Sequence, residues 1–280
     1  MNRPLIDVRA LASRERARTL VVDCRFDLSD PGKGHREYLE GHLPGAVYAS
    51  LDEDLSDLSK VREGLGRHPL PDPDDFARTL GKWGWNPDLL LVAYDTAGGA
   101  IAGRLWWMMR AVGADAAVLD GGLKAWQAAG GALEQDAVTR TPTSVRIGFD
   151  AACSIDTHAL QAGLGEGSVL LVDARAAPRY RGEAEPLDRV AGHIPGAVNR
   201  PFAANLDQDG RFRDAAELRV EFEALLQGRR AQDVVHSCGS GVTACHNLLA
   251  MEHAGLPGAR LYAPSWSGWI SDAARPVAKG

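Results

Sequence analysis

GHLPGAV at residues 41–47 returns as GHIPGAV at residues 192–198, and TLVVDCR at residues 19–25 is answered by VLLVDAR at residues 169–175. The first pair is separated by 151 positions and the second by 150, so the two offsets agree to within one residue. Self-similarity at a fixed spacing is the sequence signature of a repeated structural unit. The chain is therefore predicted to contain one fold twice.

The later parts of the two copies match as well. LLLVAYD at residues 89–95 corresponds to DVVHSC at residues 233–238, but the offset here is 143 positions, so the second copy is slightly shorter in its middle. A repeat offers a test that a single domain cannot offer. Features found in both copies are expected to be scaffold, whereas features found in one copy are candidates for chemistry.

Each copy alternates short apolar runs with helical patterns, which favours an α/β fold with a mainly parallel sheet and helices on both faces. In the second copy, Asp214–Gln227 carries apolar residues at helical spacing behind Asp214 as N-cap, and Thr243–His253 reads as a helix that ends at Gly255. The strands predicted in this copy cover residues 169–172, 197–198, 234–236 and 259–262.

The two copies are joined by a stretch without regular structure. Residues 138–152 contain a proline, several threonines and no helical period, and we interpret them as a linker. This linker divides the chain into an N-terminal domain, residues 1–137, and a C-terminal domain, residues 153–280. A length of 280 residues suits two domains of ordinary size.

Composition and charge exclude several classes of protein. Apolar residues make up 45% of the chain and charged residues 24%, as in folded globular proteins. The net charge is −6 and no basic cluster is present, which argues against a nucleic-acid partner. No apolar run approaches the ~18 residues of a membrane span, and the first residues lack the apolar stretch of a signal peptide. We therefore expect a cytoplasmic protein without a membrane or nucleic-acid partner.

One cysteine stands out among four. The cysteines are too few and too scattered for a disulfide framework, and none has the spacing of a zinc site, so no metal is expected. Cys238 alone follows a predicted strand and precedes a glycine-bearing loop, residues 239–243, that leads into a helix. The equivalent position of the first copy is Asp95. One copy therefore carries a nucleophile where the other carries a carboxylate. The remaining cysteines are Cys24, Cys153 and Cys245.

The position of Cys238 favours reactivity. A strand that ends in a tight loop and feeds a helix turns successive backbone N–H groups toward one point, and Gly239 and Gly241 let the backbone approach closely. The helix N-terminus adds partial positive charge, so the loop favours the ionised thiolate near neutral pH. The N–H groups of Gly239–Thr243 are also suited to hold a second sulfur or an oxyanion. The alternative is a buried cysteine at the end of a strand.

Phosphatase chemistry also uses a cysteine in such a loop, and the sequence disfavours it. A cysteine phosphatase needs an arginine six residues after the thiol to grip phosphate. This chain has Ala244 at that position, followed by Cys245 and His246. None of these side chains replaces a guanidinium.

CGSGVT at residues 238–243, the twin GHLPGAV and GHIPGAV segments and WSGW at residues 266–269 closely resemble the tandem-domain rhodanese family, in particular its 3-mercaptopyruvate sulfurtransferases. The resemblance covers nearly the whole chain. It implies two rhodanese-like domains, of which the first is inactive and the second catalytic. It also implies that Cys238 takes sulfur as a persulfide and passes it to a thiol, to thioredoxin or to cyanide, with no metal or organic cofactor.

The loop also indicates the sulfur donor. Thiosulfate-preferring relatives carry Arg and Lys directly after the cysteine, whereas this chain has the neutral Gly239 and Ser240, which suits the monocarboxylate 3-mercaptopyruvate better. The resemblance assigns Ser240 to proton handling and places Gly241, Val242 and Thr243 in the loop that holds the substrate. The alternative for Ser240 is an ordinary loop serine that bonds its own backbone.

A carboxylate donor needs a cation. Arg179 matches the arginine with which relatives hold the substrate carboxylate, and the alternative is a solvated surface arginine. Relatives of the mercaptopyruvate type often carry a second arginine further on. Leu187 aligns with that arginine here, and Arg189 is the candidate substitute from a shifted position.

Polar residues that recur in both copies are predicted to be scaffold. Asp23 and Arg25 recur as Asp173 and Arg175, so we assign all four to the framework.

The histidines allow two readings. His42 recurs as His193, which favours a scaffold role, but the resemblance places His42 in a relay with an aspartate, for which Asp30 is the nearest candidate. His236 lies two residues before Cys238 on the same strand face and is a possible base. We favour a buried strand histidine, since an activated thiolate needs no base.

Two rival functions remain open. A thiosulfate sulfurtransferase would use the same residues in the same roles, and comparison of kcat/KM for the two donors separates it from the favoured function. A sulfur-carrier or regulatory binding module would accept a persulfide from a partner without turning over small donors.

Overall fold

The structure is a computed structural model that describes residues 3–280. These residues form two compact units. The first unit consists of the residues up to Asp57, Leu70–Asp150 and Gln208–Phe212. The second unit consists of Leu58–Pro69, Ala151–Asp207 and Arg213–Gly280. Each unit thus includes a short segment from the other half of the sequence, and the domain boundaries at residues 137 and 153 stay a prediction.

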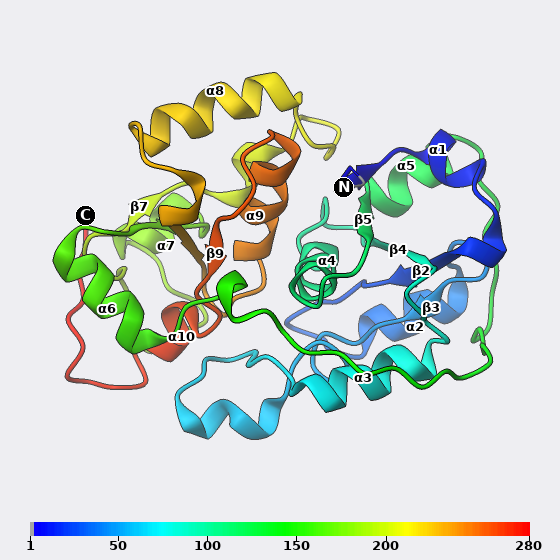
Figure 1. The fold of residues 1–280 in the computed structure, drawn as a ribbon, viewed down its shortest axis with the longest axis horizontal. Helices are drawn as coiled ribbons and strands as arrows, with labels where there is room; N and C mark the ends of the chain where they lie inside the picture. Colours follow the sequence, from blue (N-terminus) through cyan, green and yellow to red (C-terminus); the bar gives the residue numbers. More distant parts are fainter. Residues whose placement is uncertain (1–2) are drawn as a thin grey trace. The chain divides into compact units, whose positions relative to one another are not determined.

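The first unit is built on a five-stranded sheet whose strands all run parallel (Figure 1). The order across the sheet is β1-β5-β4-β2-β3. β4 is buried along its whole length, as expected for a central strand of a parallel sheet with both faces covered. The strands are β1 (Leu5–Ile6), β2 (Thr19–Asp23), β3 (Val47–Tyr48), β4 (Leu90–Tyr94) and β5 (Ala116–Leu119).

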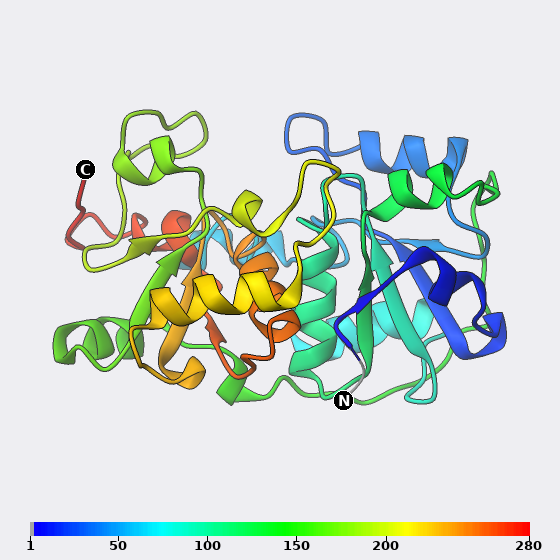
Figure 2. The same ribbon diagram turned by 90° about the horizontal axis from the view of Figure 1, so that it is seen from above.

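Helices cover both faces of this sheet. Because successive side chains of a strand point to opposite faces, β4 distinguishes the two layers. Tyr94 packs with Leu11 of α1 and Leu123 of α5. Leu91 and Ala93 point the other way and are fully buried, and α4 packs against β4 and β5 (Figure 2). The helices are α1 (Val8–Ala12), α2 (Lys33–Glu40), α3 (Pro73–Lys82), α4 (Ala102–Ala111) and α5 (Gly122–Ala128).

The second unit repeats this sheet. Its four parallel strands have the order β7-β6-β8-β9, which matches β3-β2-β4-β5 strand for strand. A parallel bridge from Ser154 to Leu261 lies beside β9 as β1 lies beside β5. The predicted repeat is therefore confirmed, and the predicted strands agree with the observed ones to within two residues. The strands are β6 (Leu170–Asp173), β7 (Val198–Asn199), β8 (Val234–Ser237) and β9 (Arg260–Leu261).

The helices of the second unit also begin and end close to the predicted positions. Asp214 caps α8, since its Oδ1 accepts a hydrogen bond from the backbone N–H of Ala216 at 2.8 Å. α9 ends at His253, and Gly255 follows with φ 75°. The helices are α6 (Thr157–Glu166), α7 (Ala177–Arg181), α8 (Ala215–Leu226), α9 (Ala244–His253) and α10 (Ser265–Trp269). Among residues 3–280, none of the helices combines the length and the hydrophobicity that a membrane span needs.

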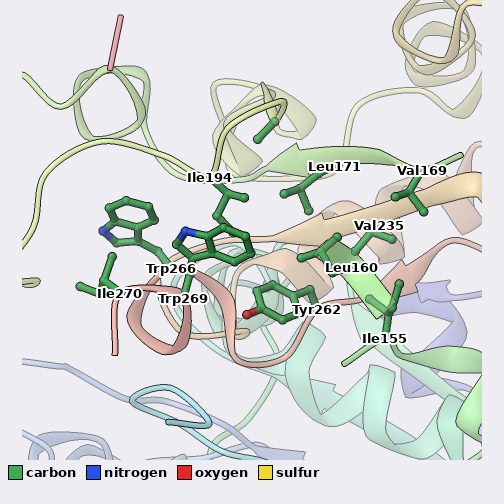
Figure 3. Packing of buried hydrophobic residues seen from close by; sticks show 11 residues of the cluster. Ile155, Leu160, Val169, Leu171, Ile194, Val235, Tyr262, Trp266, Trp269 and Ile270 are labelled. Carbon is green, nitrogen blue, oxygen red and sulfur yellow. The ribbon is translucent and has the colours of Figure 1, made fainter. Parts of the chain in front are cut away.

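The core of the second unit fixes the strand that carries the nucleophile. Leu171 of β6 and Val235 of β8 pack with Leu160 of α6 and with Trp266 of α10 (Figure 3). On the opposite face of β8, His236 contacts α9. Helices thus cover both faces here as well, and the predicted α/β class is confirmed. Because β8 is held from both sides, the residue that follows it has a defined position.

The recurring aspartate–arginine pairs make the same contacts in both units. Arg25 binds the carboxylate of Asp23 and donates from Nη2 to the carbonyl of the glycine that opens GHLPGAV, at 2.8 Å. Arg175 does the same with Asp173 and with the glycine that opens GHIPGAV, also at 2.8 Å. Each pair ties the end of a central strand to the neighbouring turn, so the predicted scaffold role is confirmed.

Candidate active site

Cys238 lies where β8 ends, and α9 begins six residues later at Ala244. The Sγ atom accepts a hydrogen bond from the backbone N–H of Gly241 at 3.2 Å. The residue is 2% exposed. The thiol therefore lies in a buried strand-to-helix loop, the environment that the sequence predicts.

The hydrogen bonding at the sulfur is simpler than predicted. The sequence predicts converging N–H groups over Gly239–Thr243, but among the described residues Gly241 N–H is the donor that reaches Sγ. Val242 and Thr243 already belong to the start of α9, since Val242 accepts a hydrogen bond from Cys245 N–H and Thr243 is the N-cap residue. The thiol thus has one fixed donor and the N-terminus of a ten-residue helix beside it.

Gly241 cannot carry a side chain. Its φ is 77°, in the left-handed region, and a Cβ atom there would lie 2.3 Å from the carbonyl oxygen of Ala263. The loop conformation that points N–H of Gly241 at the sulfur therefore depends on glycine at this position.

Residues at the start of α10 hold the backbone on both sides of the nucleophile. Ser265 Oγ accepts a hydrogen bond from Cys238 N–H at 3.0 Å and donates to the carbonyl of Tyr262 at 2.9 Å. Trp266 N–H donates to the carbonyl of Cys238 at 3.0 Å, and Ser267 N–H donates to that of Gly239 at 2.9 Å. Sequence reasoning missed Ser265, whose φ of 51° fits its place in this tight junction.

Ser240 is paired with a histidine, but not with the predicted one. Its hydroxyl lies 2.8 Å from Nδ1 of His68, and both residues are buried. The predicted relay of His42 and Asp30 is not supported by their contacts. His42 Nδ1 lies 2.8 Å from the carbonyl of Tyr38, and Asp30 forms an exposed ion pair with Arg36. His68 therefore replaces His42 as the histidine next to the candidate proton carrier.

A signal for His68 was present in the sequence. His42 has a counterpart in the second copy, whereas residues 58–69 lie where the second copy is shorter. A histidine found in one copy only is, by the test applied to Cys238, a candidate for chemistry.

Arg179 lies beside the loop, as predicted, and is held by two carboxylates. It donates to Glu185 Oε1 at 2.7 Å and to Asp188 Oδ2 at 3.1 Å, and its Nη atoms are 3.6 Å from the Cβ position of Gly239. Burial would raise the pKa of Glu185, but hydrogen bonds from Arg179 and from the backbone N–H of Leu187 hold it below its ordinary value. The arginine is therefore oriented by a carboxylate that stays ionised.

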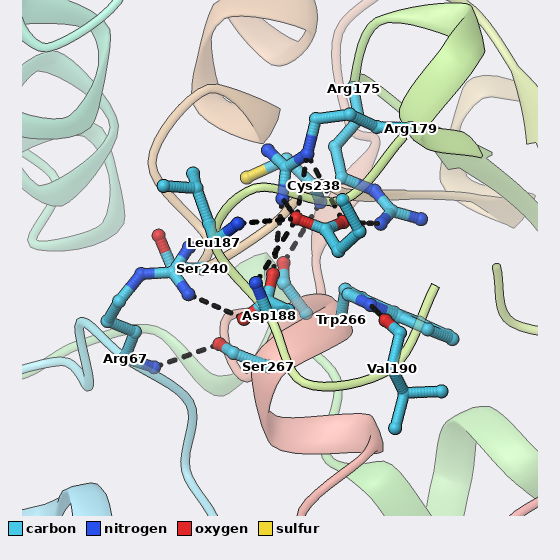
Figure 4. Close-up of polar contacts among 12 residues, drawn as sticks. Arg67, Arg175, Arg179, Leu187, Asp188, Val190, Cys238, Ser240, Trp266 and Ser267 are labelled. Atoms are coloured by element: carbon cyan, nitrogen blue, oxygen red, sulfur yellow. Dashed lines mark hydrogen bonds and ion pairs between the residues drawn. The ribbon is translucent and has the colours of Figure 1, made fainter. Parts of the chain in front are cut away.

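The contacts of Arg189 do not support it as the substitute for a second arginine. Arg189 donates to the backbone carbonyl of Ile270, away from the loop, and Leu187 is 48% exposed. Arg67 instead brings a guanidinium to the loop, with Nη2 at 3.3 Å from the Cβ position of Gly239 (Figure 4). Sequence reasoning missed Arg67, which precedes Ser240 by 173 positions.

The equivalent loop of the first unit is closed around a carboxylate. Asp95 follows β4 as Cys238 follows β8, and it is 1% exposed. Its two carboxylate oxygens accept four hydrogen bonds of 2.8–2.9 Å from backbone N–H groups of the same loop. The donors belong to Ala97, Gly99, Ile101 and Ala102. The first unit therefore fills its own anion-binding loop.

Two of the other cysteines are buried, and one of these has a raised thiol pKa. Cys24 is fully buried, and burial together with the nearby Asp95 and Asp23 carboxylates raises its thiol pKa well above the ordinary value. Cys245 donates from Sγ to the carbonyl of Gly241 at 3.4 Å and is buried in α9. Cys153 is half-buried. The environment of Cys24 contrasts with the helix N-terminus beside Cys238.

His236 is a structural histidine rather than a base. It is fully buried, and its Nε2 lies 3.0 Å from the sulfur of Met251. Burial, with a smaller contribution from the positive charge of Arg200, lowers its pKa to about 3. A group with this pKa stays neutral at physiological pH and is a weak proton acceptor, as the favoured reading of the sequence holds.

We expect His236→Gln to make folding less sensitive to acid. In the unfolded chain this histidine regains its ordinary pKa of 6.5. Below that pH it is protonated in the unfolded state but stays neutral in the folded state. Stability should therefore fall by roughly 1 kcal/mol per pH unit as pH decreases toward the folded pKa. Urea unfolding of both proteins between about pH 7 and 4.5 measures this slope. Equal slopes in wild type and variant would contradict the assignment.

The comparisons with known proteins concern the family of both halves of the chain. Residues 5–129 and residues 156–272 each match the family model of the rhodanese-like domain. A "Probable 3-mercaptopyruvate sulfurtransferase" of Pseudomonas aeruginosa is 52% identical to the chain over 93% of this chain and 92% of the relative. The thiosulfate sulfurtransferase of Bos taurus is 31% identical over 96% of this chain and 92% of the relative.

A solved structure agrees over nearly the full length. The 3-mercaptopyruvate sulfurtransferase from Leishmania major has a TM-score of 0.85 and 32% identity, and the match covers 97% of this chain and 75% of that one. Two matches to one domain model, separated as the sequence repeat predicts, place both halves of the chain in the same family. The chain therefore belongs to the rhodanese family and carries the rhodanese-like domain twice.

Proposed function

We propose that the protein is a sulfurtransferase that takes sulfur from 3-mercaptopyruvate and passes it on through a persulfide on Cys238. The proposal depends chiefly on one observation, the position of the Cys238 thiol in a strand-to-helix loop with N–H of Gly241 directed at the sulfur. The names of the relatives support the same activity. In this proposal, Ser240 and Arg179 act on the donor from the two sides of the loop.

In the first half-reaction, the Cys238 thiolate attacks the sulfur of the donor. A sulfur–sulfur bond forms while the carbon–sulfur bond of the donor breaks, and its electron pair leaves with the carbon as the enolate of pyruvate. The proton of the donor thiol ends on that carbon, so pyruvate forms without net uptake of protons. Ser240, whose hydroxyl is 2.8 Å from His68 Nδ1, is placed to pass this proton.

In the second half-reaction, an acceptor takes the outer sulfur of the persulfide. With a thiol, the acceptor sulfur attacks the outer sulfur, the sulfur–sulfur bond to Cys238 breaks, and the thiolate is restored. Cyanide reacts in the same way and gives thiocyanate. Thioredoxin or another thiol is the acceptor that we propose, with cyanide as the convenient laboratory substitute. A reducing compartment such as the cytoplasm suits a mechanism that needs a free thiol, and all four cysteines are free.

The charges around the loop favour a donor with one negative charge. Three arginines, of which Arg67 and Arg179 reach the loop, are joined with three carboxylates in one cluster, which is formally neutral before the donor binds. Binding of a single carboxylate to a neutral cluster costs less electrostatic free energy than binding of the dianion thiosulfate. Relatives that prefer thiosulfate carry Arg and Lys after the cysteine, and this loop lacks both. The members of the cluster are Arg67, Arg175, Arg179, Asp173, Glu185 and Asp188.

Donor kinetics with the purified protein test the proposal. With cyanide as acceptor, we expect kcat/KM for 3-mercaptopyruvate to exceed that for thiosulfate by at least about tenfold, since positions 239 and 240 carry no charge and the arginines that reach the loop are already paired with carboxylates. Pyruvate and thiocyanate should form in equal amounts. A preference for thiosulfate would make the protein a thiosulfate sulfurtransferase, and sulfur bound to Cys238 without pyruvate turnover would make it a carrier.

A further inference from the structure

The guanidinium of Arg67 lies at the nucleophile loop although it comes from the segment Leu58–Pro69, far from the loop in sequence. Its Nη2 is 3.3 Å from the Cβ position of Gly239, the residue next to Cys238. Arg179 reaches the same position from another direction at 3.6 Å. Two guanidinium groups therefore meet above one glycine, where any side chain would occupy the space between them.

One buried carboxylate sets the spacing of the two arginines. Arg67 Nη1 donates to Asp188 Oδ1 at 2.6 Å, and Arg179 Nη2 donates to Asp188 Oδ2 at 3.1 Å (Figure 4). The Asp188 side chain is only 5% exposed, whereas those of Arg67 and Arg179 are 27% and 19% exposed. The carboxylate is thus enclosed while both guanidinium groups keep a solvent-accessible side.

A backbone contact also holds the segment of Arg67 in place. The backbone N–H of Arg67 donates to Ser267 Oγ at 2.9 Å, and this bond does not depend on the Arg67 side chain. Its Nε is buried without a hydrogen-bond partner among the described residues. An arginine that leaves a buried Nε unpaired is a costly way to brace a loop, which points to a use for its charge beyond the ion pair with Asp188.

We propose that Arg67 is a substrate-binding residue, whose Nη2 binds the carboxylate of the sulfur donor together with Arg179. The proposal rests on the sulfurtransferase function proposed above and adds the residue that selects the donor class. Paired guanidinium groups suit a carboxylate because each offers N–H donors in a fixed plane. Asp188 pre-orients the pair, so little side-chain entropy is lost when the donor binds.

The test compares two donors that differ only at the carboxylate. Mercaptoacetone carries a methyl group where 3-mercaptopyruvate carries its carboxylate. For Arg67→Ala we expect KM for 3-mercaptopyruvate to rise about 10- to 100-fold with kcat within about threefold, because a charge-assisted hydrogen bond is lost. Kinetics with mercaptoacetone should stay unchanged. Arg67→Lys keeps the charge without the planar fork and should lie between wild type and Arg67→Ala.

A matched control is available in the same segment. Arg62 is exposed, so Arg62→Ala removes an arginine from this segment without touching the loop and should behave as wild type. An equal loss with both donors in Arg67→Ala would show that Arg67 only supports the loop and would overturn the proposal. Unchanged kinetics with 3-mercaptopyruvate would overturn it as well.

Binding of pyruvate separates this proposal from the proposed function. Pyruvate keeps the carboxylate but needs no turnover, so its Kd can be measured by calorimetry even if the wild-type chain fails to release pyruvate from 3-mercaptopyruvate. Arg67→Ala should weaken pyruvate binding by the same 10- to 100-fold, approximately, while Arg62→Ala leaves it unchanged. Equal pyruvate affinity in wild type and Arg67→Ala would refute the role of Arg67, whatever the enzyme does with its donor.

Discussion

Cys238→Ser should leave a folded protein that transfers no measurable sulfur, a loss of at least about 10³-fold in kcat with either donor. The hydroxyl of serine is not ionised at neutral pH, and an oxygen at this position cannot form a persulfide. The substitution changes one buried atom in a residue whose backbone is held by Ser265 and Trp266, so the loop should keep its conformation. Thiocyanate formation measures the activity, and thermal unfolding checks the fold.

Serine variants of the other three cysteines are the matched controls. Cys24→Ser, Cys153→Ser and Cys245→Ser remove the thiols that lie outside the loop residues 238–243 in the sequence, and each should keep sulfur transfer. Mass spectrometry after incubation with 3-mercaptopyruvate should find one added sulfur atom in each control and none in Cys238→Ser. Transfer that survives in Cys238→Ser, or disappears in one of the controls, would assign the nucleophile to another residue.

The parts of this site that the sequence predicts correctly are those that depend on local pattern and on the repeat. The strand before Cys238 is an apolar run that ends at a glycine-bearing loop, and the cap of α8 is an aspartate directly before a helical pattern, Asp214. Asp23 and Arg25 recur with their contacts intact in the second unit. Each of these features is either determined by residues close in sequence or revealed when the two copies of the repeat are compared.

The residues that the sequence does not predict reach the loop through tertiary packing. His68 lies 172 positions before its partner Ser240, in a segment that has no regular pattern beyond a short 3₁₀ turn. Arg67 is its neighbour and was missed for the same reason. The alignment with relatives directs attention to Leu187 and Arg189 instead, because an alignment compares positions and not the places that side chains reach. When a charged side chain reaches the loop from a distant segment, the spacing of residues around the loop gives no indication of it.

The two copies of the loop differ in the group that occupies the anion site. In the first unit, the Asp95 carboxylate accepts all four N–H groups that its loop offers it. In the second unit, a cysteine at the same position takes one N–H bond from Gly241. The loop of the first unit therefore has an anion built into the fold, whereas the loop of the second unit carries a thiol with one hydrogen bond.

Asp95→Ala should consequently destabilise the first unit by on the order of 3–5 kcal/mol, one of the largest stability effects expected for a loop residue. The substitution leaves four backbone N–H groups without their acceptor in a site that is 1% exposed. Urea unfolding followed by tryptophan fluorescence reports this change, since five of the seven tryptophans lie in the first unit. Asp95→Asn keeps one acceptor oxygen and should lose about half as much.

Urea unfolding reports the total loss of stability in Asp95→Ala, whereas hydrogen exchange shows which backbone N–H groups lose protection. The N–H groups of Gly99 and Ala102 are bonded to different oxygens of Asp95, so both should lose protection in Asp95→Ala. Asp88→Ala is the matched control, because this aspartate is exposed and lies just before the same strand. If Asp95→Ala is no less stable than Asp88→Ala, the carboxylate does not organise the loop. The contrast between the two loops would then fail.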